Sequence, residues 1–394
     1  METKSQGRMA GTSIYAIALT SFILFLSTQV GVPVLPHLSA QLGADQAAMA
    51  ATLSAALMTL VLFQFFSGAL ADRYGRRTVL VGGAALGGLS SLCCAVVGSW
   101  QGLLALRILG GVADAIALPA LLGLTAEISA GRHGTFFGVL RSSQGLSFIV
   151  APAIGGWLSL YGLRMPFVID AILSFLACLV LYASVRAGPV ASVTGRWQQL
   201  GELFRQRRVY AFALFGAVDN FAFPILASFL PTKAQSLGFA PWQISLILVG
   251  EATAFTAGSL LVGRCSDRWG RRPFVILAQL LVMLSCVGLA LSNSLVAMVG
   301  WYTLFGLGAS ATFLLSSVMM ADITPPESAA TALGAFDAAI DLVIFAGPAT
   351  ALTLYHVMGR IEPLFIVAAL PALAALPVAW RTRETLCLDA VGIS

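Results

Sequence analysis

The sequence predicts an all-α integral membrane protein of twelve transmembrane helices, arranged as two pseudo-symmetric bundles of six. The prediction rests on composition, on a series of long apolar runs and on an internal repeat. Of the 394 residues, 58% are hydrophobic and only 10% are charged, whereas soluble globular domains carry roughly 25% charged residues. A chain with so little charge cannot cover a soluble surface, so we expect a lipid bilayer to surround it.

Apolar runs of membrane-crossing length recur along the whole chain. A helix needs roughly 20 residues to cross a hydrocarbon core about 30 Å thick. The first run is too long for a signal peptide, so we expect it to be retained as a spanning helix. The expected spans are 13–35, 47–70, 78–98, 101–125, 135–159, 164–185, 209–230, 242–263, 274–293, 296–320, 331–356 and 361–380.

The basic residues predict the orientation. If the N-terminus is cytoplasmic, only Arg164, Lys233 and Arg360 lie outside, and Arg107 lies within a span. The other 18 of the 22 Lys and Arg then lie in or beside cytoplasmic segments, as the positive-inside rule requires. We therefore expect a multi-pass protein of the plasma membrane, of the bacterial inner-membrane kind, with both termini cytoplasmic. Such scattered clusters do not indicate nucleic-acid binding, despite the net charge of +5.

A polar, basic stretch at 186–208 interrupts the apolar runs and contains Arg205, Arg207 and Arg208. It predicts a cytoplasmic linker between an N-terminal six-helix bundle, 1–185, and a C-terminal one, 209–394.

The two halves repeat each other at an offset of 195 residues. Gly68–Arg77 matches Gly263–Arg272, and Ala126–Ile128 matches Ala321–Ile323. Both copies of the first motif fall on the same side, so the halves are parallel repeats. This architecture predicts a substrate site near the midplane between the halves and suits alternating access.

The sequence Gly68-Ala-Leu-Ala-Asp-Arg-Tyr-Gly-Arg-Arg77 resembles the signature loop of the major facilitator superfamily, and a weaker copy begins at Gly263. The resemblance covers essentially the whole chain. It implies the major facilitator fold and a loop that braces the cytoplasmic gate.

The physical chemistry of this loop agrees with a gate. A carboxylate at Asp72 would be favoured near the positive N-terminal end of the eleventh spanning helix. Arg76 and Glu127 can join it in an ionic network, and Gly75 permits a tight turn. The alternative is that the arginines only fix the topology. The predicted cytoplasmic gate comprises Gly68, Asp72, Arg73, Gly75, Arg76, Glu127, Asp267, Arg271 and Asp337.

The fourth expected span contains Leu104–Gly111, which resembles the superfamily's R-x-x-q-G motif. In the family, the arginine at the position of Arg107 is associated with proton coupling. An arginine inside a membrane costs roughly 2.5–3.5 kcal/mol on insertion scales, so it should face a cavity or a partner. Asp114 lies on the same helical face, about 10 Å further along the axis. The alternative is a pair that stabilises packing or insertion.

The second half holds most of the other intramembrane acids, including Asp219, Glu251 and Asp341. A carboxylate in a low-dielectric site can bind and release a proton near neutral pH. Each could instead be a hydrogen-bonded structural acid. The predicted proton-coupling or substrate cavity comprises Arg107, Asp114, Asp219, Glu251, Asp341, Asn220, Gln29 and Gln144.

The fifth span ends Ala151-Pro152-Ala-Ile-Gly155-Gly156. This segment is similar to the antiporter motif of drug-exporter families and departs from it at Ala151. Small residues at four-residue spacing also let helices approach closely, so helix packing is the alternative role.

These features predict a secondary active transporter, a proton-coupled exporter (antiporter) of small amphipathic or drug-like molecules. A proton-coupled importer, or a dedicated exporter of one metabolite such as a sugar or a metal-chelating molecule, is the alternative. A non-transporting receptor is a remote one. Without Walker or dinucleotide motifs, and with six scattered cysteines, we expect no enzyme activity, cofactor or metal. The expected partners are a small-molecule substrate, protons and the lipid bilayer, with no nucleic acid, and the protein is expected to work as a monomer.

Overall fold

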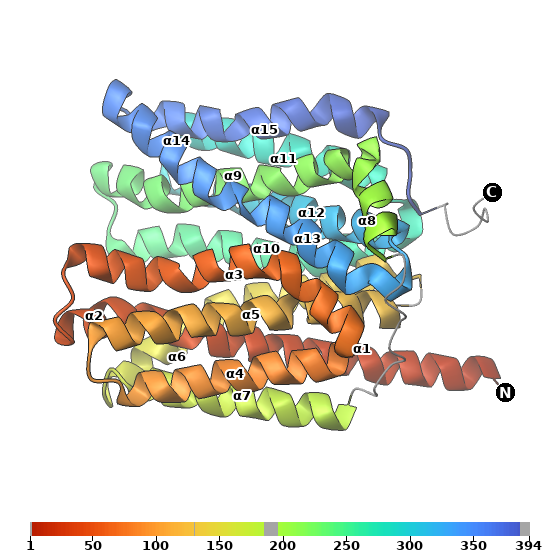
Figure 1. Cartoon of the computed structure of the whole chain (residues 1–394). Helices are drawn as coiled ribbons and strands as arrows, with labels where there is room; N and C mark the ends of the chain where they lie inside the picture. The colour runs from red at the N-terminus through yellow and green to blue at the C-terminus, as the bar shows by residue number, and fades with distance from the viewer. Residues whose placement is uncertain (1, 130, 185–195, 387–394) are drawn as a thin grey trace. The chain divides into compact units, whose positions relative to one another are not determined.

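The computed structural model describes residues 2–129, 131–184 and 196–386, and these residues form helices without any strand (Figure 1). The α-helices are α1 (Glu2–Val30), α2 (Leu35–Gln41), α3 (Gln46–Tyr74), α4 (Arg76–Val96), α5 (Trp100–Ile128), α6 (His133–Ser159), α7 (Met165–Ser184), α8 (Arg196–Arg205), α9 (Arg207–Ser236), α10 (Pro241–Trp269), α11 (Arg272–Leu291), α12 (Leu295–Ile323), α13 (Ala329–Asp341), α14 (Val343–Met358) and α15 (Glu362–Arg381). Two short 3-10 helices, η1 (Val32–Val34) and η2 (Pro326–Ser328), join them.

Eleven segments within the described residues are long and apolar enough to cross a membrane. They include every expected span except the fifth, which forms α6. This helix has 27 residues, but Arg141 and the polar residues Ser142–Gln144 make part of it less apolar. The all-α membrane class is therefore confirmed.

The internal repeat extends to the ends of the helices. α3 and α10 each have 29 residues, as do α5 and α12. The side chains of Ser99 and Ser294 accept hydrogen bonds from the first turns of α5 and α12, which stabilises helix starts. Gly75 and Gly270 adopt φ values of 91° and 90°, which an L side chain rarely does, and so let α3 turn into α4 and α10 into α11.

Two expected spans are interrupted. The first ends as a long helix at Val30, and Pro33 and Pro36 then stand at the starts of η1 and α2, where proline needs no backbone donor. The span expected at 331–356 is split between α13 and α14. Pro348 lacks an N–H, and the Phe345 amide near the break donates to Leu342 instead of continuing the α-helical pattern.

The described residues fall into two compact units. One unit comprises Met1–Ser129, Leu146–Arg196 and Pro325–Ala338, and the other comprises Ala130–Gly145, Trp197–Thr324 and Ala339–Ser394. The start of α6 thus belongs with the second unit, and most of α13 belongs with the first. The domain limits at 185 and 209 stay predictions, and residues 186–195 of the expected linker lie outside the described residues.

In the first unit, α5 packs against α3 and α4, and α7 packs against α1 and α4. Close backbone approach places Gly155 of α6 against the carbonyl oxygen of Val30, and Leu26, Val30 and Ala151 form a buried apolar cluster beside it. In the second unit, α12 packs against α9, α10 and α11, while α15 packs against α9 and α11.

Basic side chains satisfy carbonyl groups at the C-terminal ends of α7, α15, α11 and, as described below, α4. Arg77 donates to Tyr182 in α7, and the matching Arg272 donates to Trp380 in α15. Buried Lys233 donates to Leu289 and Ala290 at distances of 2.9 and 2.8 Å, at the end of α11. These carbonyls have no partner within their own helix, and a cation there is also favoured by the helix dipole.

Arg164 performs the same task for the end of α4, where it donates to the carbonyls of Ala95 and Val97 at 3.0 and 2.8 Å. Two of the three basic residues expected outside, Arg164 and Lys233, are therefore engaged by helix ends.

The contact at Gly155 provides a matched test of helix packing. We expect Gly155→Ala to lower the unfolding temperature, because its Cβ would overlap the Val30 carbonyl. Gly156→Ala is the control, since no atom lies within 4 Å of the position its Cβ would take, and alanine is favoured over glycine in helices by about 1 kcal/mol. Thermal unfolding in detergent checks this, and equal effects of the two substitutions would refute the packing role.

Candidate functional site

The first network joins the last turn of α3 to the start of α13, within the first unit. Asp72 accepts hydrogen bonds from the amide and the hydroxyl of Thr331, at 2.8 and 2.6 Å. The amide belongs to the first turn of α13, where backbone donors lack partners inside the helix. The carboxylate therefore satisfies a helix N-terminus, as the sequence predicted for this aspartate.

Arg76 completes the first network. It donates to Asp72 at 3.1 Å and to Glu127 at 2.8 Å, and it also bonds the carbonyls of Gly123 and Pro326. One guanidinium thus joins α3, α5 and the segment before α13. Because several donors are used in a fixed geometry, lysine could not replace this arginine.

The second network repeats this arrangement within the second unit. Asp267 accepts hydrogen bonds from the amides of Gly134 and Thr135, at 2.9 and 2.6 Å, and from the Thr135 hydroxyl at 2.5 Å. Both amides lie in the first turn of α6. Asp267 therefore satisfies the N-terminus of α6, as Asp72 satisfies the N-terminus of α13.

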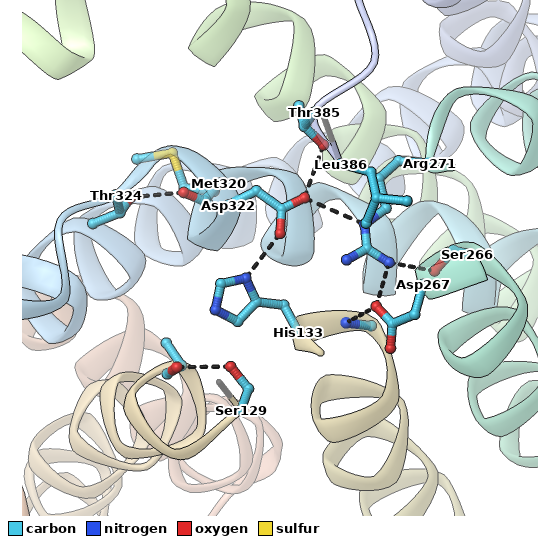
Figure 2. A network of polar contacts seen from close by, with 12 residues as sticks. Ser129, His133, Ser266, Asp267, Arg271, Met320, Asp322, Thr324, Thr385 and Leu386 are labelled. Carbon is cyan, nitrogen blue, oxygen red and sulfur yellow. Dashed lines mark hydrogen bonds and ion pairs between the residues drawn. The ribbon is translucent and has the colours of Figure 1, made fainter. Parts of the chain in front are cut away.

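Arg271 lies at the centre of the second network (Figure 2). It donates to Asp267 at 2.7 Å and to Asp322 at 3.2 Å. Asp322 also contacts His133, at 2.8 Å between Nδ1 and Oδ1. We define the first network as Asp72, Arg76, Glu127 and Thr331, and the second as Asp267, Arg271, Asp322, His133 and Thr135.

The other predicted gate residues have different surroundings. Gly68 packs directly on the backbone of Ala330, which a larger residue would prevent. Arg73 is exposed, with its guanidinium 5.3 Å from the centre of the Tyr74 ring. Asp337 is buried on α13, six residues beyond Thr331.

The first unit has a group of intramembrane charged and polar residues on α4, α5 and α7. Arg107 and Asp114 of α5 interact electrostatically, and the Arg107 Nε is a buried donor without a hydrogen-bond partner among the described residues. Asp170 of α7 is held by the hydroxyls of Ser91 and Ser174, at 2.6 and 3.3 Å. Arg107 also interacts electrostatically with Asp170, so the three charged groups form one polar cluster.

The second unit holds a larger buried acidic cluster. Asp219, Asn220 and Glu251 are each at most 8% exposed. Asn220 of α9 donates to Asp341 at the end of α13, at 3.0 Å. Glu251 of α10 interacts electrostatically with Asp219. Glu251 and Asp219 thus form one pair and Asn220 and Asp341 another, and the two pairs are joined through the neighbouring positions 219 and 220 of α9.

Arg141 is a further residue of this cluster, which the sequence analysis did not select. It is 1% exposed on α6, and its guanidinium lies 3.9 Å from the centre of the Phe313 ring. It donates to Ser317 at 3.1 Å and interacts electrostatically with Asp219. An arginine inside an expected span was the available signal, because burying that charge is costly without a partner.

The remaining predicted residues lie on α1 and α6. Gln144 accepts a hydrogen bond from Arg141 at 3.3 Å, and Gln29 is half-buried on α1. Pro152 lies inside α6. Gly155 contacts α1, whereas Gly156 has open space beside it.

A double-substitution cycle tests the pairing of Arg141 with Asp219. We expect Arg141→Met to destabilise the protein, because it leaves a buried carboxylate without its countercharge. Adding Asp219→Asn should recover part of that loss, with a coupling free energy of about 1–3 kcal/mol. Reversible denaturation in detergent measures the four proteins, and strictly additive effects would show that the two groups do not interact.

Comparison with known proteins places these features in context. The family model described as Major Facilitator Superfamily matches residues 17–232 and 212–386. Quinolone resistance protein NorA of Staphylococcus aureus is 28% identical over 188 residues, or 48% of each chain. The chain thus spans about half the length of this relative. Multidrug resistance protein 2 of Bacillus subtilis is 24% identical over 276 residues, 67% of this chain and 69% of the relative.

Solved structures share the fold over nearly the whole chain. The human organic anion transporter MFSD10 (TETRAN) has a TM-score of 0.80 at 17% identity, covering 94% of this chain and 99% of that one. The proton:xylose symporter XylE has a TM-score of 0.80 at 16% identity, covering 96% and 97%. With the family model matched over most of its length, this multi-pass membrane protein belongs to the major facilitator superfamily.

Proposed function

We propose that this transporter is a proton-coupled exporter of small amphipathic, drug-like molecules that works by alternating access. The observation that carries the proposal is the group of buried Asp219, Asn220 and Glu251, with the half-buried Asp341, in the second unit. The names of the relatives, a quinolone resistance protein and a multidrug resistance protein, support an export role.

The acidic cluster is suited to proton binding. Glu251 and Asp219 are buried and interact electrostatically with one another, which makes this pair our candidate for the proton-carrying groups. Asp219 has one carboxylate oxygen without a hydrogen-bond partner among the described residues. In our proposal these two acids exchange the coupling proton, while Asn220 orients Asp341.

Arg141 supplies the countercharge in this scheme. When Asp219 is ionised, Arg141 attracts it, and a proton on Asp219 removes that attraction. Because Arg141 is carried by α6 and Asp219 by α9, protonation would change how strongly these two helices are held together. This gives a physical route from proton binding to helix movement.

The cluster of the first unit has a supporting role in the proposal. Arg107, Asp114 and Asp170 interact electrostatically, and the charge of Arg107 would tune both acids. The proton could thus be bound in either unit, and substitution of each acid would separate the two sites.

Aromatic side chains near the acidic cluster of the second unit support an amphipathic substrate. Phe255 and Phe313 lie 6.4 Å apart between ring centres, and Tyr302 stacks on Phe305 at 5.6 Å. Glu251 interacts electrostatically with Tyr302. Rings beside carboxylates suit a flat, cationic or zwitterionic molecule, which gains from both apolar burial and charge.

In this proposal both networks close the cytoplasmic side of the transporter, and both termini are cytoplasmic. A proton-coupled importer would use the same acids and differ in the direction of substrate movement. Flux in both directions therefore decides between export and import.

Flux into proteoliposomes tests the proposal, with a fluorescent lipophilic cation and a fluoroquinolone as probes under an imposed pH gradient. We expect the gradient to drive uptake against the proton flow, and Glu251→Gln to reduce the gradient-driven rate by roughly tenfold or more, equivalent to about 1.4 kcal/mol. Glu327→Gln is the control, because Glu327 is an exposed acid of η2.

Two results would count against the proposal. Transport that ignores the gradient would remove proton coupling. A loss of flux that is equal in both variants would remove the specific role of Glu251.

A further inference from the structure

The second network contains an ionisable contact that the first network lacks. His133 contacts Asp322 at 2.8 Å, while the position that corresponds to His133 in the repeat is Ala329, which cannot form an ion pair. The acids also differ, since the side chain of Asp322 is 6% exposed and that of the matching Glu127 is 37% exposed.

The segment after α15 holds the second network in place. The Glu384 carboxylate accepts hydrogen bonds from the amides of Arg271 and Arg272, at 2.7 and 3.0 Å. Thr385 donates its hydroxyl to Asp322 at 2.8 Å. Glu384 thus satisfies the start of α11, and Thr385 fixes one oxygen of Asp322 so that the other faces His133 (Figure 2).

The charged groups closest to the His133–Asp322 contact are two carboxylates and one guanidinium. Asp322 contacts His133 directly, and Asp267 accepts a hydrogen bond from the amide of the next residue, Gly134. Arg271 pairs with both carboxylates. Arg132, directly before α6, is exposed, and the arginine of α6 itself, Arg141, lies eight residues beyond His133. The Arg272 side chain turns away to the carbonyl of Trp380. A proton on His133 therefore adds positive charge where negative charge is in excess.

We propose that the His133–Asp322 pair is a proton-dependent lock that holds the start of α6 on the end of α12. Histidine is the side chain that changes charge between about pH 5 and pH 8. With the proton bound, the contact is an ion pair that water screens poorly, because the His133 side chain is only 15% exposed. Without it, a neutral hydrogen bond remains.

The sign of the effect follows from this difference. We expect the contact to be stronger at low pH, as an ion pair, than at high pH, as a neutral hydrogen bond. This role rests on the proposed transport function. In that transporter, a lower pH on the cytoplasmic side would hold the second network closed. The first network has Glu127 and no histidine, so its strength would not change over the same pH range.

Amide hydrogen exchange of the full-length protein in nanodiscs tests the lock without measuring transport. The readout is the protection of residues 131–140, corrected for intrinsic exchange, at about pH 6 and about pH 8. We expect protection to be roughly threefold to tenfold lower at the higher pH in the unmodified protein. In His133→Gln that ratio should approach one.

Two further variants make the test decisive. Asp322→Asn also removes a partner of Arg271, so residues 131–140 should be less protected in this variant at both pH values. The ratio of protection between the two pH values should again approach one. His356→Gln changes an exposed histidine at the end of α14 and should keep the ratio of the unmodified protein. If His133→Gln and Asp322→Asn both retained that ratio, the lock would be refuted, whatever the transport assay showed.

Discussion

The arrangement depends on one interaction used twice, an aspartate carboxylate that accepts hydrogen bonds from the first turn of a helix. Asp72 binds the start of α13, and Asp267 binds the start of α6. A helix N-terminus buried without such partners would leave backbone donors unsatisfied. An arginine then fixes each carboxylate, and glycines at 68 and 263 allow the backbones to approach. Charge, helix dipole and small residues thus act at the same place in both units.

Elsewhere, buried charged groups also bind helix ends or polar side chains. Basic residues at helix C-termini, such as Lys233 and Arg164, satisfy carbonyls that the helices cannot. Two of the acids within the spans are held by polar side chains, Asp170 by serine hydroxyls and Asp341 by the Asn220 amide. The repeat is unequal at the intramembrane arginine, because Tyr302 stands where the first half has Arg107. The second unit instead receives Arg141 from α6, so its cation comes from the other half of the chain.

The sequence was sufficient for the membrane class, the repeat and the pairing of Asp72, Arg76 and Glu127, because each depends on local spacing or on matched motifs. It did not select Arg141, because its place near a span end resembles that of a topology-setting arginine. The contacts of His133 and Glu384 were also missed, since they join residues far apart in sequence. The split between α13 and α14 depends on local backbone hydrogen bonding that the apolar pattern does not specify. The roles of the candidate acids stay predictions.

The central claim is that the two aspartates anchor two different helix starts. Amide exchange of Asp72→Asn and Asp267→Asn, compared with the unmodified protein, tests it most directly. The account predicts that Asp72→Asn exposes the amides around Thr331 and leaves those of Gly134 and Thr135 protected, and that Asp267→Asn does the reverse. Unchanged protection in both variants, or the same loss at both helix starts, would contradict it.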